Sequence, residues 1–242
     1  MRSRQEIKRF AREAMAKQNG TAIVIVLVSL LISGAVGIIS ARLDVVFAGN
    51  AVLFALNQVI YIAALGMTFV MTVNAYGEYI KIWMLKPANV QELFLGFQVN
   101  FLRKLGGSLW LLLWATLWSL LFVIPGIIKF CSYFLTMNIL ADCPNVTARQ
   151  ALKLSMRITD GHKGDIFIWL LSWIGWMLLS FLTCGILYIV YVGPYYFTAY
   201  AGLYIEMRDQ ALAEGRITMA DLGKDEMIGN NAHTWESRNQ NW

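Results

Sequence analysis

Long stretches without a charged side chain constrain this chain more than any other feature. The segment between Asp165 and Glu206 holds 40 uncharged residues, and the segment between Asp44 and Glu78 holds 33. A helix that crosses a bilayer needs about 20 consecutive, mostly apolar residues. The first segment therefore has room for two crossings and the second for one. Only 14% of the residues are charged, against about 25% in soluble domains, so the sequence predicts a membrane protein.

We predict an all-α fold of the polytopic membrane class, because strands with open edges cannot satisfy their backbone groups in lipid. Six transmembrane helices account for the apolar segments, and they cover about residues 21–41, 52–75, 105–124, 126–141, 166–182 and 186–205. Together they form a membrane domain over residues 1–206, which a polar cytoplasmic tail over residues 207–242 follows. The last four spans form two pairs, and within each pair a turn signal joins the two spans: Pro125-Gly126 in the first pair and Thr183-Cys184-Gly185 in the second.

The distribution of basic residues predicts how the spans are oriented. In the seven segments that flank the six spans, Lys and Arg number 6, 1, 4, 1, 4, 0 and 4 along the chain, where Lys129 near the start of the fourth span is counted with the segment before it. Cytoplasmic connections carry the excess of Lys and Arg in membrane proteins, so both termini are expected in the cytoplasm. The net charge of +5 then favours anionic lipid headgroups at the cytoplasmic face as partners and argues against nucleic acid. A membrane-protein partner or a second copy of the chain stays open.

An internal repeat appears when the sequence is shifted by 59 residues. Lys104 then aligns with Lys163, Trp110 with Trp169, Trp114 with Trp173, and Gly126 with Gly185. The pattern of each copy predicts a cytoplasmic amphipathic helix followed by a helical hairpin. The N-terminal part of the chain fits the same pattern as a third copy. The three amphipathic helices are expected over Arg2–Lys17, Asn89–Lys104 and Asn145–Asp160, the last with Asn145 or Thr147 as its N-cap.

Several short motifs in the second half of the chain resemble one known family. They are Ile124-Pro125-Gly126-Ile127-Ile128-Lys129, Ala141-Asp142-Cys143-Pro144, Ala151-Leu152-Lys153-Leu154-Ser155, Gly161-His162-Lys163, Ser172-Trp173-Ile174-Gly175-Trp176, Leu182-Thr183-Cys184-Gly185-Ile186 and Pro194-Tyr195. Together these motifs resemble bacterial integral membrane proteins of the domain of unknown function 975 family, and more loosely the membrane domains of some glycerophosphodiester phosphodiesterases. The resemblance implies a multi-pass protein of the bacterial plasma membrane, usually from Gram-positive bacteria, with no assigned activity. Cys143 departs from the Asn expected between Asp and Pro.

Six residues are candidates for ligand binding because they place polar groups in or beside the spans. Lys129 lies within the fourth span, where it either snorkels to the outer headgroups, the interpretation we favour, or faces the bundle and binds an anion. Asp142 and Glu206 lie at inner ends of spans; Asp142 either ends a helix or pairs with Lys153 or Arg157. The remaining candidates are Asn138, Tyr191 and Tyr195, which are polar or phenolic groups inside the last spans.

Signatures of catalysis, metal binding and cofactor binding are missing from the sequence. No phosphate-binding glycine loop is visible, and His162 and His233 lie too far apart along the chain to indicate a metal site. The three cysteines do not form a disulfide pattern. A bridge between Cys131 and Cys184 is less favoured than a packing role for both. We therefore predict no catalytic residue, no metal and no cofactor.

These observations favour a non-enzymatic membrane protein. It would bind or move a lipid-like or amphipathic molecule, or support a membrane partner that does so. Two alternatives stay open: a secondary transporter that couples through Lys129, Asp142 and Glu206, and an intramembrane enzyme that modifies lipid. A pure scaffold would differ from the first hypothesis only in copurifying with a partner.

Overall fold

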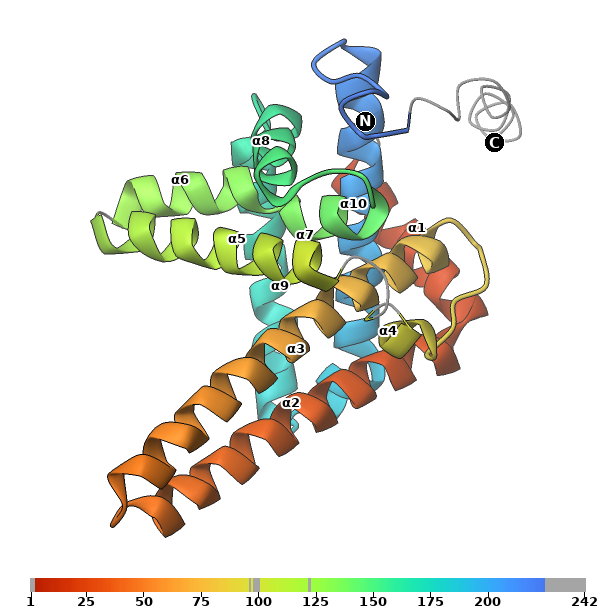
Figure 1. The fold of residues 1–242 in the computed structure, drawn as a ribbon. Helices are drawn as coiled ribbons and strands as arrows, with labels where there is room; N and C mark the ends of the chain where they lie inside the picture. The colour runs from red at the N-terminus through yellow and green to blue at the C-terminus, as the bar shows by residue number, and fades with distance from the viewer. Residues whose placement is uncertain (1–2, 96, 98–100, 122, 225–242) are drawn as a thin grey trace.

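The described part of the chain is helical throughout. The computed structural model describes residues 3–95, 97, 101–121 and 123–224, and within these ranges it contains helices and connections but no strand (Figure 1). The all-α prediction is therefore confirmed for these residues. The elements are α1 (Arg4–Lys17), α2 (Asn19–Phe47), α3 (Ala51–Trp83), α4 (Glu92–Leu95), α5 (Phe101–Leu121), α6 (Val123–Tyr133), α7 (Thr136–Asp142), α8 (Ala148–Ile158), α9 (Lys163–Leu182), the π-helix η1 (Tyr188–Val192) and α10 (Gly193–Ala213).

Three helices in the described ranges are long and apolar enough to cross a membrane. They are α2, α3 and α9, with 29, 33 and 20 residues. They contain the predicted spans over residues 21–41, 52–75 and 166–182. Large apolar side chains stay exposed on their outer parts, for example Val45, Ile62 and Phe181 at 77%, 67% and 86%. Such broad apolar exposure is unusual for a soluble monomer and is consistent with a membrane protein.

The fourth predicted span, residues 126–141, is not one continuous helix. It is divided into α6 and α7, which have 11 and 7 residues. The predicted turn at Pro125-Gly126 is wrong in position, because both residues lie within the first turns of α6. Proline is tolerated there because backbone N–H groups in the first turn of a helix have no intrahelical acceptor, so the missing N–H of proline breaks no hydrogen bond. The Thr183-Cys184-Gly185 turn is confirmed: Cys184 and Gly185 take positive φ angles of 51° and 83° between α9 and η1.

Side chains from α8 satisfy the backbone where α6 gives way to α7. The Ser155 hydroxyl donates to the carbonyl oxygen of Ser132 (2.8 Å) and accepts from the N–H of Leu135 (3.2 Å). Tyr200 of α10 donates to the carbonyl oxygen of Phe134. Backbone groups that leave a helix inside a membrane protein need such partners, so contacts from distant elements stabilise this interruption.

Helices form over most of two of the three segments where an amphipathic helix is predicted, and each has residues that are buried in the protein. In α1, Ile7, Ala11, Ala14 and Met15 are buried, and α1 packs against α10 and α3. Thr147 is the N-cap of α8, where its side chain and Gln150 form a capping box.

The predicted helix over Asn89–Lys104 is wrong. Its described residues hold only the four-residue α4 before α5 begins at Phe101. Asn89 accepts the N–H of Gln91 through its side chain (3.0 Å). Its own N–H donates to Glu78 (2.9 Å). Such side-chain bonds compete with helix formation, which explains the turn structure before α4.

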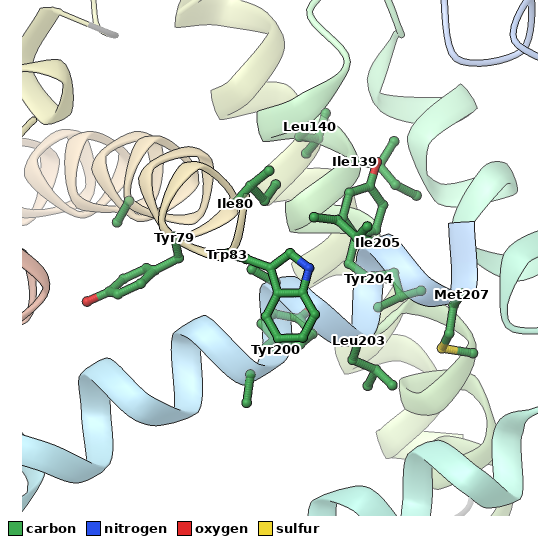
Figure 2. Close-up of a cluster of buried hydrophobic side chains, with 14 of the residues drawn as sticks. Tyr79, Ile80, Trp83, Ile139, Leu140, Tyr200, Leu203, Tyr204, Ile205 and Met207 are labelled. Carbon is green, nitrogen blue, oxygen red and sulfur yellow. The ribbon is translucent and has the colours of Figure 1, made fainter. Parts of the chain in front are cut away.

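The core lies where α3 packs against α10 and α7 (Figure 2). Trp83, Tyr200 and Tyr204 are among its large buried side chains. Gly202 of α10 allows Trp83 to approach closely, because an ideal Cβ at this position would lie 2.3 Å from Cζ3 of Trp83. The same indole contacts Phe10 of α1 edge to face at 4.7 Å between centroids. The buried half of the molecule is therefore tightly packed, and it borders the cleft described next.

Candidate ligand-binding cleft

A cleft of about 530 Å³ opens beside this core. Its walls come from the second half of α3, the connection to α4, the start of α5 and the end of α7. Three carboxylates and three lysines contribute to its lining, together with Asn74 and several apolar side chains. The charged lining residues are Glu78, Lys81, Lys86, Glu92, Lys104 and Asp142. A cleft with both signs of charge and an apolar component suits a ligand that is itself amphipathic.

One wall is organised by a buried carboxylate of α3. The side chain of Glu78 is 4% exposed. Its Oε1 accepts from Nζ of Lys81 at 2.7 Å, and its Oε2 accepts from the N–H of Asn89 at 2.9 Å. Both oxygens are thus bonded, as a buried charge requires. Glu78 thereby holds the connection after α3 against the helix and fixes this side of the cleft.

A second part of the lining is built around Lys104 near the start of α5. Its Nζ donates to Oδ1 of Asn74 at 2.6 Å, and Nδ2 of the same amide donates to the carbonyl oxygen of Leu93 at 2.9 Å. Burial lowers the pKa of Lys104, the nearby Arg103 charge lowers it further, and Glu92 opposes both effects. Lys104 therefore brings a positive charge to the cleft wall, where Asn74 is one of its partners.

Arg103 joins this wall to the end of α7. Its guanidinium donates to the carbonyl oxygens of Leu140, Cys143 and Val146 at 2.7, 2.9 and 2.8 Å. These include carbonyls at a helix C-terminus, which lack intrahelical partners. The contact places Asp142, the last residue of α7, on the same cleft as Lys104.

Asp142 is the most extensively bonded carboxylate of the cleft. Its Oδ2 accepts from the Tyr204 hydroxyl (2.8 Å), from Nη1 of Arg208 (2.9 Å) and from Nζ of Lys224 (2.9 Å). Burial by itself would raise the pKa of Asp142, but the Arg208 and Lys224 charges outweigh it and lower the pKa below its ordinary value. Asp142 is thus held ionised, and it pairs with neither Lys153 nor Arg157.

Through Lys224, Asp142 also anchors the segment that follows α10. The helix continues past residue 206 to Ala213, and Ile217 and Leu222 are buried. Asn145 donates to the carbonyl oxygen of Gly223 at 3.1 Å. The described part of the predicted tail therefore packs on the helices beside the cleft.

Cys143, which follows Asp142, is not a reactive group in this arrangement. Burial and the neighbouring Asp142 charge raise its pKa to about 11. A thiol with so high a pKa stays protonated and weakly nucleophilic near neutral pH. All three cysteines are free thiols: Cys131 and Cys143 are buried and Cys184 is exposed.

Of the six candidates from the sequence, only Asp142 lines the cleft. Asn138 lies one turn earlier on α7, fully buried beside Tyr200. Tyr191 and Tyr195 contact each other at 5.6 Å between ring centroids, away from the cleft lining. Lys129 on α6 and Glu206 on α10 do not line this cleft either. The structure thus does not gather the intramembrane candidates into one site.

Sequence reasoning missed most of the charged cleft residues because it ended the second span at residue 75. In the structure, α3 continues to Trp83, so Asn74, Glu78 and Lys81 fall at spacings of four and seven residues on one helix face. That spacing was a usable signal. The pairing of Asn74 with Lys104 had none, since it joins residues 30 positions apart.

Comparison with known proteins gives one match. The family model described as "Protein of unknown function (DUF975)" matches residues 120–211. This region contains α6 to α9, η1 and most of α10, and so includes Asp142, Tyr204 and Arg208 but not the α3 wall of the cleft. No curated protein and no solved structure matches the chain. The looser resemblance to glycerophosphodiester phosphodiesterase membrane domains therefore has no support among the matches. Within the described residues, no group of three or more His, Cys, Asp or Glu side chains could hold a metal ion.

Proposed function

We propose that this protein binds an amphipathic molecule at the cytoplasmic end of a six-span membrane bundle. Residues 120–211 of the chain belong to the DUF975 family of unknown function. The spans would be α2, α3, α5, α6 with α7, α9, and η1 with α10, arranged as three hairpins. The alternation of Lys and Arg supports this count and places both termini in the cytoplasm of the plasma membrane. In that orientation, the charged cleft lies at the inner ends of α3, α5 and α7.

The observation that carries the proposal is that side chains of both charge signs line one partly apolar cleft. Lys104 and Asn74 form one polar wall, and Glu78 with Lys81 forms another. A ligand with an anionic group, a cationic group and an apolar part would match these walls. Phosphatidylethanolamine has these three components, and its headgroup lies at the corresponding depth in a bilayer. We therefore propose a zwitterionic, amine-bearing phospholipid, or a molecule of like chemistry, as the ligand that is bound or moved.

A secondary transporter that couples through Lys129, Asp142 and Glu206 has less support. Such coupling would require all three groups on one cavity, and the cleft includes only Asp142. Asp142 is moreover bonded to Tyr204, Arg208 and Lys224, which suits an anchoring role better than a reversible coupling role.

Replacing Lys104 with Met should weaken lipid binding by about tenfold, since a hydrogen bond to a charged group contributes about 1.5–3 kcal/mol. Full-length protein in nonionic detergent would be titrated with dioctanoyl phosphatidylethanolamine and dioctanoyl phosphatidylcholine, and bound lipid counted by native mass spectrometry. Wild-type protein should prefer the primary amine headgroup.

Lys153→Met is the matched control, because it removes the same charge from an exposed position outside the cleft. It should leave ethanolamine lipid binding unchanged. Thermal unfolding of each variant would separate lost binding from lost folding. Equal binding of both lipids, or equal loss in both variants, would refute the cleft as the binding site.

A further inference from the structure

A second charged concavity lies on α8, apart from the cleft. Its volume is about 400 Å³, and its lining consists of Lys153, Met156, Arg157, Asp160 and Arg216. Lys153, Met156 and Arg157 of α8 are spaced three and four positions apart and so share one helix face, and Asp160 lies in the turn that follows α8. We call this concavity the α8 groove. None of its lining residues belongs to the cleft lining, so the two sites are separate.

Arg216, from the segment after α10, is held rigidly at one end of the groove. Its Nη1 donates to the carbonyl oxygens of Arg157, Ile158 and Asp160 at 2.9, 2.8 and 3.2 Å, where α8 ends. Its Nη2 is buried and has no hydrogen-bond partner within the described residues. The guanidinium is therefore preorganised at this end of the groove.

The acidic groups around the groove are each already matched to a cation. Asp160 pairs with Lys163 at 3.7 Å, Asp221 with Arg157 at 3.3 Å, and Glu214 with Arg216 at 2.6 Å. Lys153 makes no hydrogen bond or ion pair within the described part of the chain. The unmatched charge that faces a ligand in this groove is therefore positive.

A tryptophan of a predicted span packs against the first turn of α8, outside the groove lining. Arg149, one turn before Lys153 on α8, lies over the Trp110 ring of α5 at 4.9 Å from its centroid. Tryptophan is enriched at the level of the headgroups. On the proposed topology, α8 belongs to a cytoplasmic connection, so the groove would face the headgroups of the inner leaflet.

We propose that the α8 groove binds the phosphate of an anionic phospholipid of the inner leaflet. Lys153 supplies the main attraction, and the Arg157 and Arg216 guanidinium groups provide donors of the geometry that phosphate accepts. Met156 supplies apolar contact for the glycerol and the first acyl carbons. This site differs from the cleft in ligand class, because it selects net negative charge rather than a zwitterion.

The test uses full-length protein in nonionic detergent with three probes: dioctanoyl phosphatidylglycerol, dioctanoyl phosphatidylcholine and inorganic phosphate. Binding would be measured by native mass spectrometry for the lipids and by competition for phosphate. Lys153→Met should weaken phosphatidylglycerol binding about fivefold, the value of one surface cation near anionic lipid, and Lys153→Glu should weaken it more. Lys17→Met, an exposed α1 lysine outside both sites, should leave it unchanged.

Each remaining outcome decides against the assignment. Equal binding of phosphatidylglycerol and phosphatidylcholine, or equal losses in the Lys153 and Lys17 variants, would show that the groove has no selectivity. Inorganic phosphate that competes as well as the lipid would assign the groove to a soluble phosphate compound instead. Lys104→Met is a further comparison, because it should leave phosphatidylglycerol binding unchanged. Failure of the cleft proposal can therefore be distinguished from failure of the α8 groove proposal.

Discussion

Replacing Asp142 with Asn should destabilise the protein by about 3–5 kcal/mol, the usual cost of removing one partner from a buried ion pair. The side chains of Asp142, Arg208 and Lys224 are 12%, 13% and 19% exposed. Asparagine keeps the size of the side chain but removes its charge. The variant therefore removes the carboxylate that Arg208 and Lys224 share, and Arg208 keeps the more exposed Asp209 as an ion-pair partner. Denaturation by sodium dodecyl sulfate in mixed micelles, followed by circular dichroism, measures the free energy of unfolding.

Asp209→Asn is the matched control for this variant. Asp209 pairs with the same guanidinium, 2.7 Å from Nη2 of Arg208, but its side chain is 53% exposed. Exposed ion pairs contribute about 0–1 kcal/mol, so this change should be nearly neutral. Similar losses in the two variants would show that burial of Asp142 does not determine its contribution.

The same carboxylate predicts a direction for the pH dependence. The pKa of Asp142 is lower in the folded protein than its ordinary value of 3.8. Its contribution to stability is therefore complete above the ordinary pKa, and it is lost as pH falls through the lowered, folded-state pKa. The wild type should lose more stability than Asp142→Asn when the pH is lowered across this window. An equal loss in both proteins would contradict the assignment.

Replacing Gly202 with Ala should destabilise the protein by about 1–3 kcal/mol, the common cost of an overpacked core. The added methyl would lie 2.3–2.5 Å from three ring atoms of Trp83. The indole also packs against Phe10, so a shift of the ring would disturb that contact. Figure 2 shows Trp83 next to α10 within the cluster of buried side chains. Thermal unfolding in detergent measures the effect.

Gly175→Ala and a compensating variant test the steric cause. A Cβ at Gly175 of α9 meets nothing within 4 Å, so alanine there should be neutral or stabilising, as its higher helix propensity implies. Trp83→Leu combined with Gly202→Ala should be less destabilised than the sum of the two single variants, because the clash is absent. If the stability losses of the two single variants added up in the double variant, the added methyl would not clash with the Trp83 ring.

Features set by local periodicity were predictable from the sequence. The face of α1 that contains Ile7, Ala11 and Met15 follows helical spacing, and it is buried as that spacing implies. Thr147 caps α8 through a bond to a residue three positions away. In both cases the information lies within a few residues of the feature, so a single sequence is enough.

Features that depend on distant partners were not predictable. At the interruption between α6 and α7, Ser155 bonds the N–H of Leu135 and Tyr200 bonds the carbonyl oxygen of Phe134. These partners lie 20 and 66 positions apart in the sequence. The apolar pattern of residues 126–141 is compatible with one helix or two, and only tertiary contacts decide between them. Likewise, Asp142 was recognised as notable, but its partner Lys224 lies 82 positions away. Hydropathy and spacing carry no signal for such a pair.

The orientation of the bundle underlies both proposed sites, and Cys184 offers the most direct measurement of it. The Thr183-Cys184-Gly185 turn joins the fifth and sixth proposed spans, and among the three thiols only that of Cys184 is exposed. Intact cells that express the protein would be treated with a membrane-impermeant maleimide, and the modified cysteine identified by mass spectrometry, with Cys184→Ser as the blank. The proposed topology predicts that Cys184 is modified without permeabilisation. Modification only after the membrane is opened would place this turn in the cytoplasm and contradict the account.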